Sequence, residues 1–273
     1  MSRISECFQH LAKQGRKALI PYIVAGDPVQ EITVPLMHRL VESGADILEL
    51  GVPFSDPMSE GPVIQLAHER ALANGMSLKR ALELVREFRQ SDDATPVLLM
   101  GYANPVMRMG YAEFADAAVT AGLDGLLTVD IPPEEVAHVN AELRRVGIDN
   151  ILLIAPTTPE ERVAQITERA SGFIYYVSLK GVTGAGHLNT GEVARRLGGI
   201  RMHSDLPVAV GFGIKDAESA KAVAAVADGV VVGSALVSVV AQAIETAGEP
   251  GAALDAATGL LMQIRQGIDS AAS

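Results

Sequence analysis

The chain has 273 residues, of which 48% are hydrophobic and 20% charged, and its formal net charge is −11. This length and apolar content fit an α/β protein with a substantial core, and the negative charge argues against an electrostatic surface for nucleic acid or anionic membranes. Cys7 is the single cysteine, which excludes an intrachain disulfide and a cysteine-based zinc site.

The N-terminal segment predicts an amphipathic helix with Ile4, Phe8 and Leu11 on one face. It lacks the apolar core of a secretory signal, and the sequence contains no apolar run of about 18 residues that would span a membrane. We therefore expect a soluble, cytoplasmic protein.

Short β-like runs alternate with helical patterns along the rest of the chain. The predicted strands are Ala18–Val24, Ile47–Leu50, Pro96–Gly101, Gly125–Val129, Ile151–Ile154, Phe173–Val177, Pro207–Val210 and Gly229–Val232. The predicted helices include Thr33–Ser43, Leu78–Arg89, Tyr111–Ala121, Glu134–Val146, Pro159–Ala170, Ala217–Val226, Ala235–Thr246 and Ala252–Ile268.

Strands that alternate with crossover helices predict a parallel sheet, and eight such units in this length predict a closed (β/α)8 TIM barrel. The first helix would cover the barrel bottom, and the last would be an extra C-terminal helix. A doubly wound open sheet is the alternative. Because no linker or change in composition divides the chain, we expect residues 1–273 to form a single domain.

Glu49 and Glu60 stand out among the four acids of the segment from Asp46 to Gln65. Glu49 falls within an apolar run that predicts a buried strand, and Glu60 follows in a loop rich in proline and glycine. A buried carboxylate costs several kcal/mol unless it is protonated or hydrogen-bonded, so this pair favours acid–base chemistry. The alternative is a structural role, in which Glu49 forms a cap or an ion pair.

The turns after the seventh and eighth predicted strands predict a phosphate site, which in such barrels often lies at this place. The sequences V-A-V-G-F-G-I and V-V-V-G-S-A-L put Gly211, Gly213 and Gly233 there. Glycines let backbone amides approach an anion closely, and Ser234 would open a helix whose N-terminus favours negative charge. Because the two turns contain no cation, we expect the amides to hold the anion. Tight turns alone would also explain the glycines.

Residues near the strand ends would wall an apolar pocket between the acids and the phosphate site, although each also fits an ordinary core position. They are Tyr22, Leu99, Leu127, Val129, Ile154, Tyr175 and Phe212. The expected ligand therefore has a phosphate at one end and an apolar or aromatic body near Glu49 and Glu60.

Segments spread over nearly the whole chain resemble the tryptophan synthase α subunit family. In order, they read P-Y-I-V-A-G-D-P, L-E-L-G-V-P-F-S-D-P, G-Y-A-N-P, D-I-P-P-E-E, G-V-T-G-A-G and G-F-G-I. The resemblance implies a lyase of L-tryptophan biosynthesis that cleaves indole-3-glycerol phosphate to indole and D-glyceraldehyde 3-phosphate. It implies catalysis by Glu49 and Glu60, although the family normally has aspartate at position 60.

The resemblance also implies binding roles for further positions. Tyr175, Thr183 and Phe212 would contact substrate, with Thr183 closing toward Glu60. The phosphate would be bound by Gly184, Gly213, Gly233 and Ser234. Residues 53–62 and 181–189 would form lids that exclude water.

The family's partner is a β subunit that carries pyridoxal phosphate, so the resemblance implies an α–β–β–α heterotetramer. Pro53, Asp56 and Asn104 match positions near that contact. No cofactor and no metal are expected in this chain.

Other functions stay open on the sequence alone. Lys180, near the end of the sixth predicted strand, would suit a Schiff-base (class I) aldolase. The chain would alternatively serve mainly as a regulatory partner subunit. A metal-assisted epimerase is disfavoured because it needs clustered histidines and aspartates at successive strand ends.

Overall fold

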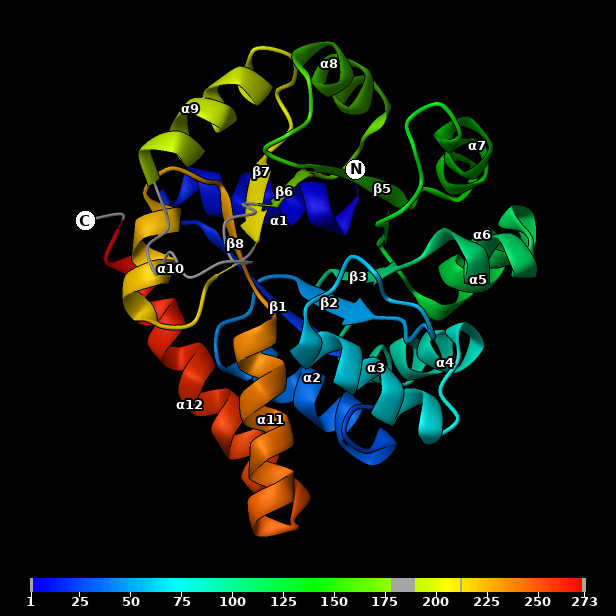
Figure 1. Ribbon diagram of the computed structural model, residues 1–273, viewed down its shortest axis with the longest axis vertical. Helices are drawn as coiled ribbons and strands as arrows, with labels where there is room; N and C mark the ends of the chain where they lie inside the picture. Colours follow the sequence, from blue (N-terminus) through cyan, green and yellow to red (C-terminus); the bar gives the residue numbers. More distant parts are fainter. Residues whose placement is uncertain (1, 178–189, 212, 272–273) are drawn as a thin grey trace.

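Parallel strands form a closed barrel in the computed structural model, which describes residues 2–177, 190–211 and 213–271 (Figure 1). The strands are β1 (Ala18–Val24), β2 (Leu48–Gly51), β3 (Val97–Gly101), β4 (Gly125–Thr128), β5 (Asp149–Ile154), β6 (Ile174–Val177), β7 (Val208–Gly211) and β8 (Gly229–Val232). Because β8 pairs with β1, the sheet has no open edge. The predicted TIM barrel is confirmed, and the doubly wound open sheet is wrong.

Helices surround the barrel throughout the described ranges. They are α1 (Arg3–Lys13), α2 (Thr33–Glu42), α3 (Pro62–Ala73), α4 (Leu78–Phe88), α5 (Ala103–Met109), α6 (Tyr111–Ala121), α7 (Val136–Val146), α8 (Glu160–Arg169), α9 (Thr190–Arg201), α10 (Ala217–Ala224), α11 (Ser234–Ala247) and α12 (Pro250–Asp269), with a 3-10 turn η1 (Gln30–Ile32). The expected extra C-terminal helix is α12, which packs against α10, α11 and α2. None of the helices in the described ranges combines the length and apolarity needed to cross a bilayer.

The predicted strands and helices match the observed ones to within two residues at each end, but α3, α5 and α9 were not predicted. Each of these three carries residues typical of loops. Pro62 opens α3, where its missing N–H costs nothing, and Pro105 lies in the first turn of α5. Gly198 and Gly199 lower the helix propensity of α9.

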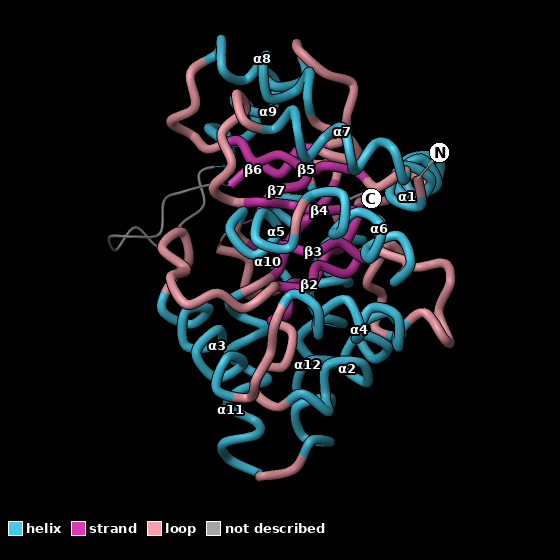
Figure 2. The backbone as a smooth tube through the Cα atoms, turned by 90° about the vertical axis from the view of Figure 1, so that its right-hand side faces the viewer, coloured by secondary structure: helices cyan, strands magenta, loops and turns pink. Residues whose placement is uncertain are grey.

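The barrel interior is closed at its bottom by α1, as predicted. Ile4, Phe8 and Leu11 are buried and form one cluster with the inward side chains of the strands. The Phe8 ring lies 5.5 Å from the ring of Phe173, measured between centroids. Figure 2 shows α1 at one end of the barrel. The loops that follow the strands are at the other end, and there the functional site must be sought.

Candidate active site

Glu49 projects into the barrel from β2. Its strand neighbours Leu48 and Leu50 belong to the layer between strands and helices, so the alternation of a strand turns Glu49 inward. The side chain is 0% exposed, and neither carboxyl oxygen has a hydrogen-bond partner among the described residues. Burial, and secondarily the charge of Glu60, raises the pKa of Glu49 to about 8. Glu49 therefore carries a proton at neutral pH, and in the described structure it forms neither a cap nor an ion pair.

Glu60 lies on the loop between β2 and α3. The Ser59 amide donates to the Tyr102 hydroxyl at 3.0 Å, and the Phe54 ring stacks on the Tyr102 ring with centroids 4.9 Å apart. The Glu60 carbonyl accepts from Gln65 Nε2 at 2.9 Å. These contacts hold the loop over the barrel mouth. Burial raises the pKa of Glu60 to about 7, so this carboxyl exchanges a proton readily near neutral pH.

A cavity of about 460 Å³ brings Glu60 together with the turns after β7 and β8. Its lining residues are Tyr22, Glu60, Gly61, Ile64, Met100, Tyr175, Gly213, Ile214, Lys215, Val231, Gly233, Ser234 and Ala235. The cavity thus brings one of the two predicted acids, Glu60, together with the glycine turns, whereas Glu49 is not among the described residues that line it.

The phosphate end of the cavity contains a cation that the sequence reasoning missed. Gly213 adopts φ +78°, a left-handed conformation that favours glycine, and the chain then brings Lys215 to the cavity. Gly233 precedes α11, and the first amides of that helix, from Ser234 on, have no partner within the helix. An anion in this end of the cavity would meet helix amides and one ammonium group, so amides need not hold it alone.

Two tyrosine hydroxyls occupy space that strand glycines leave open. A Cβ atom on Gly51 would lie 2.3 Å from Tyr22 Oη, and one on Gly211 would lie 2.3 Å from Tyr175 Oη. Tyr22 and Tyr175 are both buried and both line the cavity. Gly211 thus makes room for Tyr175 inside the barrel and is not among the described residues that line the cavity.

Not every predicted pocket residue reaches the cavity. Leu127 and Val129 face the interior cluster next to the α1 contacts. The prediction for Leu99 and Ile154 is wrong, because both belong to the layer packed under the helices. On β3, Leu98 and Met100 face the barrel interior. Because neighbouring residues of a strand point to opposite sides of the sheet, Leu99 between them faces the helices.

Several sequence-predicted residues lie outside the described ranges. They are Thr183, Gly184 and Phe212, together with Lys180 of the aldolase alternative.

The predicted partner-contact positions lie on the β2–α3 loop and on α5. Asp56 and Asn104 are exposed, whereas Pro53 is buried within the loop. Two large apolar side chains near them are exposed as well: Met58 is 85% exposed and Met107 56%. The contacts of Tyr102 with Phe54 and Ser59, given above, keep the loop and the start of α5 together.

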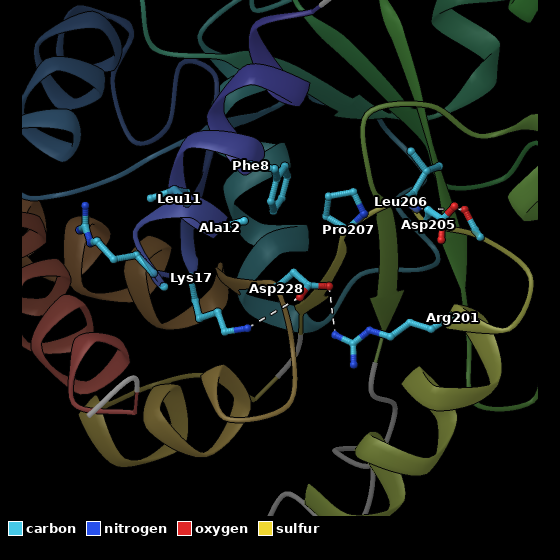
Figure 3. Close-up of a pocket in the computed structure, with 12 residues that line it drawn as sticks. Phe8, Leu11, Ala12, Lys17, Arg201, Asp205, Leu206, Pro207 and Asp228 are labelled. Carbon is cyan, nitrogen blue, oxygen red and sulfur yellow. Dashed lines mark hydrogen bonds and ion pairs between the residues drawn. The ribbon is translucent and has the colours of Figure 1, made fainter.

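A second cavity, of about 490 Å³, lies at the barrel bottom beside α1 (Figure 3). Its walls include Phe8 and Leu11, with Asp228 between two cations. Lys17 Nζ lies 3.7 Å and Arg201 Nη2 3.0 Å from the Asp228 carboxylate. Because Asp228 already pairs with both of these cations, we assign this cavity a structural role, and the cavity at the barrel mouth is the candidate active site.

Comparison with known proteins agrees with the geometry. Residues 8–263 match the family model described as tryptophan synthase alpha chain. The chain belongs to the tryptophan synthase alpha chain family.

Two members of the family illustrate the similarity. The alpha chain of Thiobacillus denitrificans is 58% identical over 271 residues, covering 99% of this chain and 97% of its own. The crystal structure of the alpha subunit from Legionella pneumophila str. Paris superposes with a TM-score of 0.92 at 48% identity, covering 99% of both chains.

A second structure, tryptophan synthase from M. tuberculosis in its aminoacrylate-bound form, gives a TM-score of 0.87 at 34% identity, covering 98% of this chain and 100% of that one. Membership in the family supports the lyase interpretation, and not a Schiff-base aldolase or a purely regulatory protein.

Proposed function

We propose that this chain cleaves the carbon–carbon bond of indole-3-glycerol phosphate, releasing indole and D-glyceraldehyde 3-phosphate, with Glu49 and Glu60 as the catalytic acids. The observation that carries the proposal is Glu49 itself. It is a fully buried carboxyl without a partner in the described ranges and is protonated at neutral pH, and it lies near enough to Glu60, which lines the cavity, for the Glu60 charge to raise its pKa. A pair of acids with raised pKa values in a cleft is the arrangement that proton transfer to and from a substrate requires.

The substrate binds with its phosphate at the β7 and β8 turns. The amides at the start of α11 and the Gly213 turn receive the phosphate oxygens, and Lys215 adds a positive charge at the edge. The indole ring then lies against Tyr22 and Tyr175, near the two acids. The family pattern adds further contacts to this proposal. The substrate would meet Thr183 and Phe212, its phosphate would meet Gly184, and Leu127 would lie below the indole ring.

The acids move protons in a balanced cycle. Glu49 donates its proton to C3 of the indole ring while Glu60 accepts the proton of the ring nitrogen, which gives an indolenine. The carboxylate of Glu49 then takes the proton of the side-chain hydroxyl next to C3. As that hydroxyl becomes the aldehyde, the bond to C3 breaks and its electron pair returns to the ring. Glu60 gives the proton back to the nitrogen, so indole leaves and both acids regain their first state.

Substitution of the acids tests this assignment. Glu49→Gln keeps the shape but holds no transferable proton, and we expect indole release from indole-3-glycerol phosphate to fall about 1,000-fold. Glu60→Ala should lower it about 100-fold. Glu69→Gln, on the exposed side of α3, is the matched control and should behave like wild type. Turnover near the wild-type rate in Glu49→Gln would refute the assignment.

The same proposal includes docking on a β subunit that holds the pyridoxal phosphate, in an α–β–β–α assembly. Asp56, Asn104 and the exposed methionines Met58 and Met107 supply the contact surface, and Pro53 shapes the loop behind it. Exposed apolar side chains grouped on one side of a molecule are typical of a protein interface.

A pair of charge substitutions tests the docking surface. Met58→Asp with Met107→Asp should weaken binding to the β subunit in titration calorimetry, while unfolding stays unchanged. Met202→Asp is the control, because Met202 is 80% exposed next to Arg201 at the barrel bottom. Equal affinity of the double variant and the control would remove this surface from the proposal. A cytoplasmic location and a single domain over 1–273 stay predictions.

A further inference from the structure

His68 is a buried side chain that the reaction scheme leaves unused. It lies on α3, is 2% exposed, and its ring stands between two polar groups from different elements. The Phe54 amide donates to His68 Nδ1 at 3.2 Å, and His68 Nε2 lies 3.3 Å from the Tyr22 hydroxyl. The imidazole therefore joins the loop that carries Glu60 to a side chain that lines the cavity.

These two contacts fix where the ring hydrogen lies. A backbone amide only donates, so Nδ1 must be the acceptor, and a neutral ring then carries its hydrogen on Nε2. Burial lowers the pKa of His68, which favours the neutral ring. Nε2–H consequently donates to Tyr22 Oη, and the hydroxyl hydrogen of Tyr22 must point elsewhere.

Two acids are near enough to Tyr22 to be considered as acceptors of its hydroxyl hydrogen: Glu49, which pairs with Tyr22 across the β1–β2 register, and Glu60, which lines the same cavity as Tyr22, whereas Glu49 is not among the described residues of that lining. The hydroxyl lies against Gly51, where even a methyl group would not fit, and the ring lines the cavity together with Glu60. The titratable groups that face Tyr22 are His68 on α3, Glu49 on β2, Glu60 on the β2–α3 loop, Tyr102 after β3 and Tyr175 on β6. Of the neighbouring charges, that of Glu60 acts most strongly on Tyr22, and that of Glu49 acts most strongly on Tyr175.

We propose that His68 is a positioning residue that turns the Tyr22 hydroxyl toward Glu60, so that a relay from the Phe54 amide through His68 and Tyr22 delivers a hydrogen bond to the Glu60 carboxylate. The relay gives the two acids different protonation states: Glu60 gains a donor that favours its ionised form, while Glu49 has no donor among the described residues and keeps its proton. The inference rests on the proposed function, because the first proton transfer of that reaction needs Glu49 protonated and Glu60 ionised at the same time.

Three variants separate the parts of the relay. Tyr22→Phe removes the donor to Glu60. His68→Asn keeps an acceptor near the Nδ1 position for the Phe54 amide but no longer reaches Tyr22. His68→Gln places an amide N–H near the Nε2 position and should restore much of the effect. His138→Asn, on the exposed side of α7, is the control.

The first measurement is the pH profile of indole release. Tyr22→Phe and His68→Asn should each lower kcat about tenfold or more, with KM changed less than about threefold, and should move the acidic limb to higher pH. Because the two residues act in series, the double variant should be no slower than Tyr22→Phe alone. Losses that multiply, or a His68→Asn profile equal to wild type, would overturn the relay.

The second measurement does not depend on activity. Carboxyl carbon NMR should show a higher Glu60 pKa in Tyr22→Phe and in His68→Asn than in wild type, and ring nitrogen shifts should show the Nε2–H tautomer of His68. An unchanged Glu60 pKa, or a hydrogen on Nδ1, would overturn the inference even if wild type releases indole. If wild type releases none, the proposed function fails, and the NMR result still decides the relay.

Discussion

The chemistry that we assign to Glu49 carries a cost in stability that depends on pH. In the unfolded chain Glu49 ionises near the ordinary 4.5, whereas burial raises its pKa in the barrel to about 8. Between these values the unfolded chain has lost a proton that the folded barrel retains, so the free energy of unfolding falls as pH rises. At about 1.4 kcal/mol per pKa unit, the full loss is about 5 kcal/mol.

Glu49→Gln removes this titration and leaves the shape of the side chain nearly unchanged. We expect the variant and wild type to be similarly stable near pH 5, and the variant to be more stable at pH 9 by most of that amount. Urea unfolding followed by far-UV circular dichroism at both pH values measures the difference, with Glu69→Gln as the control. A difference between variant and wild type that does not change with pH would refute the buried, proton-bearing Glu49.

Two further substitutions follow from the cavity. Lys215→Met should raise KM for the phosphate substrate about two- to fivefold with kcat nearly unchanged, because a partly exposed ion pair contributes up to about 1 kcal/mol and weakens in salt; a fall in kcat alone would contradict this. Gly51→Ala should destabilise the barrel by about 1–3 kcal/mol in urea unfolding, since its methyl group would meet the Tyr22 hydroxyl. Adding Tyr22→Phe should recover part of that loss, and Gly251→Ala, which meets open space on α12, should cost nothing.

The sequence predicted those parts of the site that a local pattern encodes. The sequence shows directly an acid inside an apolar strand and glycines after the seventh and eighth strands. In a parallel barrel, the loops that follow the strands all lie at the same end, so these residues are expected to lie near one another. Glu49, Gly213 and Gly233 were predicted in this way, and the structure places the two glycines at the cavity and Glu49 inside the barrel. The resemblance to a family added the reaction, which the residues by themselves do not specify.

The remaining features depend on which way each side chain points in the folded barrel, and the sequence alone does not show this. Leu99 and Ile154 were misplaced because consecutive strand residues face opposite sides, and the inward set is decided only by how the barrel closes. Lys215 was missed because the left-handed turn at Gly213 carries it back to the cavity. His68 shows no pattern at all, since a single histidine on a helix acquires its partners only from the packing of that helix.

The β2–α3 loop also links two surfaces of the molecule. Met58 points outward on it, and Glu60 stands two positions further along the same backbone, which the amide of Ser59 fastens to Tyr102. A partner that binds the outer side of this short segment therefore also changes the position or the mobility of Glu60 on its inner side. Thermodynamic reciprocity then requires that a molecule lodged in the barrel mouth change the affinity of the outer surface by the same factor.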